Sequence, residues 1–262
     1  MSQTFRHLEI LDIVRRDGKV TVEQLADQLG VTLQTIRRDL SELGEAGKLE
    51  RVHGGAVLPS GTVNIAYEER RRLNAEGKVA MAKACAALIP EDCALFLNIG
   101  TSTEAVATEL LAHRNLLVVT NNMNVANILT RNPHCEVVVT GGALRQSDGG
   151  LTGDITTAAI RQFKFDIGVI GCSAIDTDGD ILDFDLREVG VSRTILNQSR
   201  RRMLLADHTK FRRKAPARIG SLSEIDVFLT DARVPAALAE ACAGWQTQIE
   251  VSSPPRSPGD DI

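Results

Sequence analysis

Hydrophobic residues in the first 57 positions recur at the spacing of short amphipathic helices. In the first of these helices the apolar positions are Leu8, Leu11 and Val14. A second helix is predicted to begin after Thr21, because Thr21 and Gln24 match the capping-box pattern, and to end at Gly30. The chain therefore opens with two short helices, and a tight glycine turn separates them from the next element.

A third helix is predicted to follow Thr32, which can serve as its N-cap. Its apolar positions are spaced to line one face, namely Leu33, Ile36, Leu40 and Leu43. At about 100° per residue, Gln34, Thr35 and Arg38 project from the opposite face, and Arg37 lies on its flank. The two adjacent arginines are therefore not packing residues.

The segment KLERVHGGAV, residues 48–57, has the pattern of two short extended runs that a tight glycine turn joins. Three helices followed by a basic hairpin are the layout of a winged helix-turn-helix domain. In that geometry Gln34 and Thr35 can reach base edges, where Gln suits adenine and Arg suits guanine, and Arg37 can hold a phosphate. The predicted DNA-binding residues are Thr32, Gln34, Thr35, Arg37, Arg38, Arg51 and His53.

Helical spacing alone leaves a second interpretation of this segment open. Arg38 can pair with Glu42, four residues further on, as on an exposed helix of an ordinary bundle. Residues 1–57 hold eight Lys and Arg against nine acidic residues. Any DNA binding therefore depends on geometry and on the pairing of copies more than on a bulk positive charge.

The hydrophobic pattern changes after residue 57. Residues 58–78 are typical of a linker that enters a helix, and the run EERRR within it is most simply a solvated helical turn. From residue 79 to 252, short apolar runs alternate with helical patterns: CALFLNIG, LLVVTNN, CEVVVTGG, FDIGVIGCSAID, RMLLAD and DVFLTD. This alternation predicts an α/β domain with a mostly parallel sheet covered on both faces. Residues 253–262 are expected to form a disordered tail.

Polar and glycine-rich sequences follow several of the predicted strands, where open α/β sheets bind ligands. Gly100 is followed by three hydroxyl residues and a helical pattern, which would bring backbone N–H groups, hydroxyls and a helix N-terminus together as a phosphate site. Glycine and hydroxyl residues also make ordinary turns and N-caps, so both interpretations stay open. Lys210 and Arg145 can supply positive charge. Acidic residues that can accept hydrogen bonds from a polyol, or serve simply as loop acids and caps, are Asp154, Asp183, Asp185 and Glu188.

Composition narrows the classes of function. The net charge of the 262 residues is −4, which argues against a protein that coats nucleic acid through bulk charge. The five cysteines form no CxxC pair and the five histidines lack metal-ligand spacing, so we expect reduced thiols and neither a metal nor a cofactor. The sequence shows no signal region and no apolar run of membrane-spanning length, and we expect a cytoplasmic protein that does not enter membranes.

Several motifs occur in one order along nearly the whole chain: TLQTIRRDLSEL, RVHGGAVLP, LNIGTSTEAVA, VVTNNMNVAN, TGGALR and LLADHTKF. In this combination the sequence resembles the DeoR-type bacterial transcriptional repressors. The resemblance implies that residues 1–57 bind operator DNA and that residues 79–252 are a sugar-phosphate-isomerase-like sensor domain. It places the family's phosphate loop on Gly100 to Thr103 and its active-site-like lysine on Lys210. Asn98 stands where many members carry Asp, and Ser102 where Thr is usual.

The same resemblance implies the partners of the protein. We expect a homodimer or homotetramer that binds double-stranded operator DNA and is released by a small phosphorylated polyol or sugar. The segments NIGTSTEAVA, GGLTGD, SAIDTDGDILDFDLREV and ADHTKF resemble the family's regulators of glycerol 3-phosphate metabolism, so glycerol 3-phosphate is the favoured effector. The predicted effector-binding residues are Asn98, Gly100, Thr101, Ser102, Thr103, Asn121, Gly141, Gly142, Arg145, Asp154, Glu188 and Lys210.

A sugar-phosphate isomerase with an accessory helix-turn-helix domain is the alternative. Its chemistry would need a carboxylate base, for which Asp154 or Glu188 is available, with Lys210 as an electrostatic partner. An enzyme has no evident use for the helix-turn-helix pattern, so we expect a sensor and not a catalyst. Sequence alone does not separate a repressor from an activator.

Overall fold

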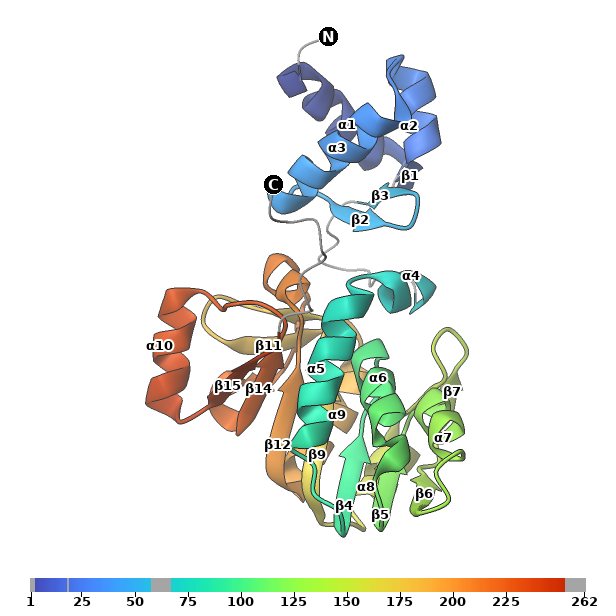
Figure 1. Ribbon diagram of the computed structural model, residues 1–262, viewed down its shortest axis with the longest axis vertical. Coiled ribbons are helices and arrows are strands. Elements are labelled where there is room, and N and C mark those ends of the chain that lie inside the picture. The colour runs from blue at the N-terminus through green and yellow to red at the C-terminus, as the bar shows by residue number, and fades with distance from the viewer. Residues whose placement is uncertain (1–2, 18, 58–66, 253–262) are drawn as a thin grey trace. The chain divides into compact units, whose positions relative to one another are not determined.

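The computed structural model describes residues 3–17, 19–57 and 67–252. Its contacts divide the chain into two compact units, Met1–Leu73 and Asn74–Ile262 (Figure 1). We describe each unit by itself.

The segment predicted as a linker, residues 58–78, is partly helical. Helix α4 spans Tyr67–Arg72, and helix α5 spans Ala75–Ala87. The rest of this segment, 58–66, and the predicted tail, 253–262, lie outside the described residues.

The first unit has the layout of a winged helix-turn-helix. Its helices are α1 (Gln3–Asp17), α2 (Val22–Leu29) and α3 (Leu33–Glu45), and its antiparallel sheet has the order β1 (Lys19–Thr21), β3 (Gly55–Val57), β2 (Glu50–Val52). Thr21 and Gln24 form the expected capping box, and Gly30 ends α2 in the left-handed conformation with φ 64°. Strand β1 is an addition, because the sequence predicted only the β2–β3 hairpin.

The core of this unit corrects two of the predicted packing positions. Ile10, Val14, Leu25, Ile36 and Leu40 are among its fully buried side chains. Leu8 is 57% exposed, because it lies about 200° around α1 from Ile10, and Leu33 is 41% exposed at the first residue of α3. The buried stripe of α3 therefore begins at Ile36.

A seven-stranded parallel sheet is the centre of the second unit. Across the sheet, the strands are β15 (Gln248–Val251), β14 (Val227–Thr230), β12 (Ser199–Leu205), β9 (Phe165–Gly171), β4 (Cys93–Leu97), β5 (Leu116–Thr120) and β6 (Cys135–Val139). Because neighbouring residues of a strand face opposite sides, Leu95 and Leu97 belong to one hydrophobic core and Phe96 to the other. The predicted α/β architecture is thus present.

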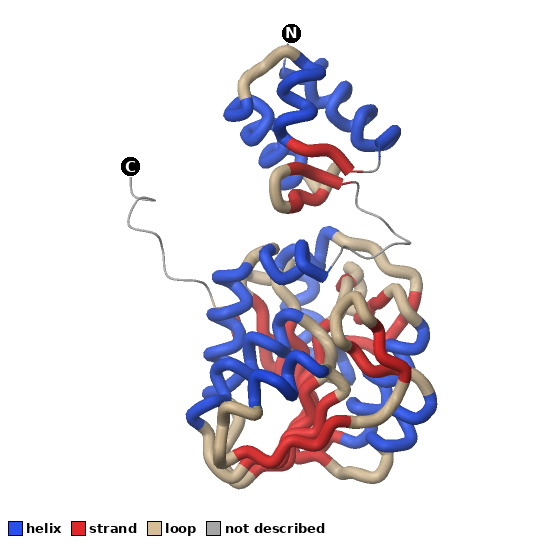
Figure 2. The backbone as a smooth tube through the Cα atoms, turned by 90° about the vertical axis from the view of Figure 1, so that its right-hand side faces the viewer, coloured by secondary structure: helices blue, strands red, loops and turns tan. Residues whose placement is uncertain are grey.

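Helices cover both faces of this sheet, as Figure 2 shows in a view closer to its edge. Helix α5, with α6 (Thr101–Glu109) and α7 (Met123–Leu129), packs on the core that includes Leu95. The other face carries α8 (Asp154–Ile160), α9 (Leu186–Gln198) and α10 (Ala236–Trp245). No described helix is both long enough and apolar enough to cross a membrane.

Smaller elements surround the edge at which the parallel strands end. They are the hairpin β7 (Ala143–Arg145) and β8 (Gly150–Thr152), and a sheet of β10 (Ala174–Ile175), β11 (Asp180–Asp183) and β13 (Ala217–Ser221). The described residues of the unit also form the short 3-10 helices η1 (Leu110–Ala112), η2 (His208–Arg212) and η3 (Leu222–Glu224). The sequence pattern predicted none of these additions.

Candidate functional site

The outer face of α3 carries the polar residues predicted to contact DNA. Gln34, Arg37 and Arg38 are exposed and Thr35 is partly exposed. Thr32 caps the helix, since its hydroxyl accepts the Thr35 N–H at 3.2 Å, and the two hydroxyls lie 2.9 Å apart. Gln34, Arg37 and Arg38 thus form the open surface of the helix, while Thr32 shapes its N-terminus.

Arg38 also makes the alternative contact that the sequence allowed. Its Nε donates to Glu42 Oε1 at 3.0 Å, and the Arg38 side chain is 77% exposed. An exposed pair at this spacing contributes only a few tenths of a kcal/mol. The ion pair therefore does not commit Arg38 to Glu42, and a phosphate or base can compete for the guanidinium.

A buried carboxylate holds α3 against α1, and sequence reasoning missed it. Asp39 is 1% exposed and accepts hydrogen bonds from Arg6 through both of its oxygens, one of them at 3.0 Å from Nη2. His7 Nε2 lies 3.2 Å from the same carboxylate. The hydrogen bond to Asp39 raises the pKa of Arg6. Because Asp39 directly follows Arg38, its pairing with Arg6 fixes the rotation of α3 about its axis. Arg37 and Arg38 then lie on the outer side of the helix.

The hairpin of the first unit is held close to its neighbours. Arg51 Nη1 donates to Ser41 Oγ on α3 at 2.6 Å, and His53 is exposed at the turn beside Gly54, whose φ is 74°. A Cβ at Gly55 would lie 1.8 Å from the carbonyl oxygen of Val20, so only glycine allows β3 to pair here with β1. The two predicted wing residues, Arg51 and His53, therefore lie on a wing of fixed geometry.

In the second unit, the loop after β4 leads directly into α6. Asn98 is buried, and its side chain donates to Ser192 Oγ at 2.9 Å and accepts the Ile99 N–H at 2.7 Å. Gly100 precedes α6 with φ 144°. Thr103 Oγ1 lies 2.7 Å from the carbonyl oxygens of both Asn98 and Gly100, so its hydroxyl is used to shape the turn.

The beginning of α6 retains the features of an anion site. The first N–H groups of a helix have no carbonyl partner inside it, and they carry the positive end of its dipole. Here these groups belong to Thr101, Ser102 and Thr103, and Thr101 is partly exposed. Thr101 and Ser102, of which Ser102 is buried, are therefore the candidate phosphate-binding residues of this loop.

The loops after β5 and β6 pack tightly beside this turn. Asn121 is fully buried and donates to the Leu151 carbonyl at 3.0 Å, while its Oδ1 has no hydrogen-bond partner in the described part of the chain. Gly142 has φ 141°, and a Cβ there would lie 2.1 Å from Thr156 Oγ1. That hydroxyl donates to the carbonyl of Gly141 at 2.7 Å, so the two glycines bring the β6 loop against the start of α8.

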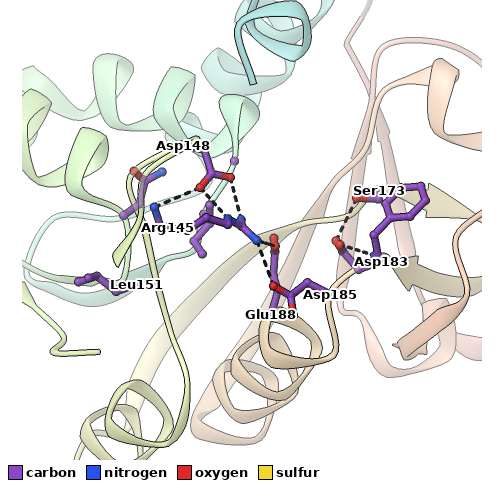
Figure 3. Close-up of polar contacts among 12 residues, drawn as sticks. Arg145, Asp148, Leu151, Ser173, Asp183, Asp185 and Glu188 are labelled. Carbon is purple, nitrogen blue, oxygen red and sulfur yellow. Dashed lines mark hydrogen bonds and ion pairs between the residues drawn. The ribbon is translucent and has the colours of Figure 1, made fainter. Parts of the chain in front are cut away.

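Arg145 pairs with one other predicted effector residue, Glu188, and with Asp148, which was not predicted, as Figure 3 shows. Its Nη1 lies 2.7 Å from Glu188 Oε2, and its Nη2 lies 2.7 Å from Asp148 Oδ2. Asp185, which caps α9 through the Arg187 N–H, lies 3.5 Å from the same Nη1. Burial lowers the pKa of Arg145, but the carboxylates of Asp148 and Glu188 outweigh it and raise the pKa. The charge of Arg145 is therefore already balanced within the protein.

Lys210 lies in η2, which follows β12. Burial raises the pKa of the Cys172 thiol to about 12, and the nearby charge of Lys210 opposes this shift. Cys172 follows β9, which is the neighbour of β4 in the sheet. Because η2 directly follows β12 in the parallel sheet, Lys210 lies at the edge where the strands end, which is also the edge of the Gly100 loop after β4.

The other acidic residues predicted as hydrogen-bond acceptors for a polyol are Asp183, Asp154 and Glu188. Two of them are bonded within the protein, and the third is exposed at a helix start. Asp183 accepts a hydrogen bond from Ser173 Oγ at 3.1 Å and another from the Phe184 N–H at 2.6 Å (Figure 3). Asp154 is exposed at the first residue of α8. Glu188 is paired with Arg145, which leaves it poorly suited to act as a base. Among the described residues, no group of His, Cys, Asp and Glu is arranged to hold a metal ion.

Comparison with known families covers both units. A DeoR-like helix-turn-helix domain matches residues 6–62, and a DeoR C terminal sensor domain matches residues 73–232. The glycerol-3-phosphate regulon repressor of Escherichia coli (strain K12) is 43% identical over 251 residues, which cover 96% of this chain and 100% of that protein. The protein of the same name from Haemophilus influenzae is 44% identical and covers 88% of this chain and 90% of its own. The transcriptional repressor CsqR of Escherichia coli (strain K12) is 38% identical over 93% of this chain and 94% of its own.

Solved structures resemble the chain only remotely. A D-ribose-5-phosphate isomerase in complex with phospho-erythronic acid has a TM-score of 0.39 and 13% identity, and covers 51% of this chain and 52% of its own. A translation initiation factor eIF-2B of Pyrococcus horikoshii OT3 has a TM-score of 0.45 and 13% identity, and covers 80% of this chain and 67% of its own.

Proposed function

The chain belongs to the DeoR family of transcriptional regulators, and from this premise we propose that it represses a carbon-catabolic operon and leaves its operator when a small phosphate ester binds. The observation that carries the proposal is the match to named repressors over both units, with a helix-turn-helix unit at one end and a sensor unit at the other. The three relatives described above are named as repressors, which supports a regulator over the isomerase alternative.

The first unit is the DNA-binding part of this proposal. Gln34 and Arg38 lie on the exposed face of α3 and can read base edges in the major groove, and Arg37 on its flank can hold a phosphate. We propose that Arg51 and His53, on the wing, approach the phosphate backbone of the DNA. Since these 57 residues carry no net positive charge, we propose that a homodimer or homotetramer presents paired recognition helices to a repeated operator sequence.

The second unit is the effector-binding part. We propose that the phosphate lies at the N-terminus of α6, against Thr101 and Ser102, with Lys210 as its counter-charge. In this arrangement the ion pair between Arg145 and Glu188 holds the β7–β8 hairpin beside the ligand. Glycerol 3-phosphate is the proposed effector, because two relatives that match most of the chain are named for that compound.

A thermal-shift titration of the full chain tests this assignment. The compounds are glycerol 3-phosphate, fructose 1-phosphate, fructose 6-phosphate and inorganic phosphate. A ligand at about 100 times its dissociation constant adds roughly 2.7 kcal/mol of apparent stability, which such a titration detects easily. We expect selective stabilisation by glycerol 3-phosphate, and stabilisation by a sugar phosphate instead would contradict that choice of effector. If none of the four compounds shifts the unfolding transition, the phosphate site itself is overturned.

A further inference from the structure

Asp231 joins two segments of the sensor unit that are far apart in sequence. It follows β14 directly and is 6% exposed. Its Oδ1 accepts the backbone N–H of His208 at 2.7 Å, and its Oδ2 lies 2.8 Å from His208 Nδ1. The same Oδ2 accepts Asn74 Nδ2 at 2.7 Å. One buried carboxylate therefore holds both the start of η2 and the residue before α5.

Asn74 has a conformation that suits this bond and not the capping of α5. It occupies the N-cap position with φ 51° and ψ 45°, yet its side chain makes no capping hydrogen bond. An Asn at this position ordinarily accepts an N–H of the first helical turn. The amide of Asn74 is instead directed to Asp231, at the cost of a left-handed backbone.

Gly77, in the first turn of α5, provides the space for this pair. A Cβ at that position would lie 2.5 Å from Asn74 Nδ2 and 2.7 Å from Asp231 Oδ2. Any larger residue would push the amide and the carboxylate away from the helix. Three features thus favour the contact between Asn74 and Asp231. They are the 2.7 Å hydrogen bond, the left-handed backbone of Asn74 and the absence of a side chain at Gly77.

The two ends of this connection have different places in the proposed function. His208 is the first residue of η2, two residues before Lys210, and the Lys210 N–H donates to the Asp207 carbonyl at 3.0 Å. Asn74 is the first residue of the second unit, directly after Leu73 of the first. The carboxylate of Asp231 therefore connects the short helix that carries the effector lysine to the point at which the chain enters the sensor unit.

We propose that Asp231 is a positioning residue that couples the Lys210 helix to the start of α5, so that effector binding changes operator affinity through Asn74. This inference rests on the proposed function, because it needs an effector that binds Lys210. A ligand that draws Lys210 toward its phosphate shifts η2, and His208 and Asp231 carry that shift to Asn74. Contiguous bonds provide the route, and the coupling is the quantity to be measured.

The test replaces Asn74→Gly and compares it with Asn115→Gly. Glycine tolerates the left-handed backbone, so the first variant removes only the side chain and its bond to Asp231. Asn115 is a matched control, because its φ is 52° and its Nδ2 donates to Asp92 at 2.9 Å. It directly precedes β5 and so lies where the parallel strands begin, away from the loops at which they end. Operator affinity is measured with and without saturating glycerol 3-phosphate, on a duplex that the wild-type protein selects from a random-sequence library.

We expect glycerol 3-phosphate to weaken operator binding about 5- to 150-fold in wild type and in Asn115→Gly, but less than about 2-fold in Asn74→Gly. The dissociation constant of Asn74→Gly for glycerol 3-phosphate should stay near the wild-type value. Asp231→Asn, which places an amide donor opposite Asn74, should lose the response in the same way.

Two results would overturn the coupling alone. One is an Asn74→Gly variant that responds like wild type, and the other is a variant that no longer binds glycerol 3-phosphate, since Asn74 would then support the ligand site itself. Failure of the wild-type protein to bind or respond to glycerol 3-phosphate would overturn the choice of effector, and the coupling with it. That result appears in the wild type before any variant is measured, so the two failures are distinguishable.

Discussion

Arg145 Nη1 lies 2.7 Å from Glu188 Oε2, and this ion pair ties the β7–β8 hairpin to the first turn of α9. The same guanidinium contacts Asp148, whose side chain is 1% exposed. Two predicted effector residues therefore neutralise each other before any ligand binds. Under the proposed function, the effector phosphate therefore needs a cation other than Arg145, and this is the role proposed for Lys210.

Replacing Arg145→Ala should destabilise the sensor unit. The substitution leaves the carboxylate of Asp148 buried without its cation, and breaking such a pair costs about 3 kcal/mol. The only tryptophan, Trp245 in α10, reports the unfolding of this unit in urea. Arg187→Ala is the matched control, because Arg187 is 68% exposed and its pair with Asp185 should contribute less than about 1 kcal/mol. Equal losses of unfolding free energy in the two variants would contradict a stabilising role for the ion pairs of Arg145.

Removing the carboxylate of Asp39 should impair DNA binding without affecting the sensor. Asp39→Ala leaves Arg6 and His7 without their shared partner and should destabilise the first unit by about 2 kcal/mol. Operator binding should fall, while the stabilisation of the Trp245 transition by glycerol 3-phosphate should be unchanged. Asp27→Ala, on the exposed side of α2, provides the control. An Asp39→Ala variant with wild-type operator affinity would show that this anchor is dispensable.

Local sequence signals predicted those features of the fold whose causes lie within a few residues. The capping box of Thr21 and Gln24 and the left-handed Gly30 are of this kind, and the structure confirms both. The alternation of apolar runs with helical patterns likewise predicted the parallel sheet, because buried strands need apolar residues on both faces.

Contacts between distant residues were beyond sequence reasoning. Arg6 and Asp39 are 33 residues apart, and Arg145 and Glu188 are 43 apart, so no periodic pattern links them. The sequence identified Arg145 and Glu188 as candidates by their residue types, but it could not show that they pair. Asp39 was overlooked because an acid between an arginine and a leucine has no distinctive spacing.

The stability of the sensor unit should depend on pH through His208 and Asp231. The hydrogen bond to Asp231 raises the pKa of His208, although burial lowers it. Burial raises the pKa of Asp231, but its bonds from His208 and Asn74 outweigh this and lower it. The contribution of His208 is complete below its ordinary pKa of about 6.5 and is lost as pH rises through the raised value. That of Asp231 is complete above about 3.9 and is lost as pH falls through the lowered value.

Urea unfolding followed by Trp245 fluorescence measures this dependence. The difference in unfolding free energy between wild type and His208→Gln should be largest near pH 6 and should shrink toward pH 9. A difference that stays constant over this range would contradict a charged contact between His208 and Asp231.

Lys210→Ala should abolish the effector response and leave operator binding intact. Without the ammonium group, the N-terminus of α6 alone must balance the phosphate, so the affinity for glycerol 3-phosphate should fall at least about 10-fold, by comparison with the loss of one charged hydrogen bond. Isothermal titration gives the effector affinity, and a gel-shift assay gives operator binding. Lys214→Ala, an exposed lysine four residues further on, is the control. Unchanged induction in Lys210→Ala would remove the lysine from the site.

Arg38→Ala distinguishes base recognition from phosphate contact on α3. The exposed Arg38 gives up only a weak pair with Glu42 when it meets DNA, so the full interaction with a guanine should be available. If Arg38 reads a base, its loss should weaken operator binding by about 1 to 3 kcal/mol and relax the sequence preference at one position, while nonspecific binding changes little. Arg200→Ala is the control, because Arg200 has a similar exposed pair with Asp166 in the sensor unit. Equal loss on operator and random DNA would instead assign Arg38 to the phosphate backbone, since such contacts weaken all sequences alike.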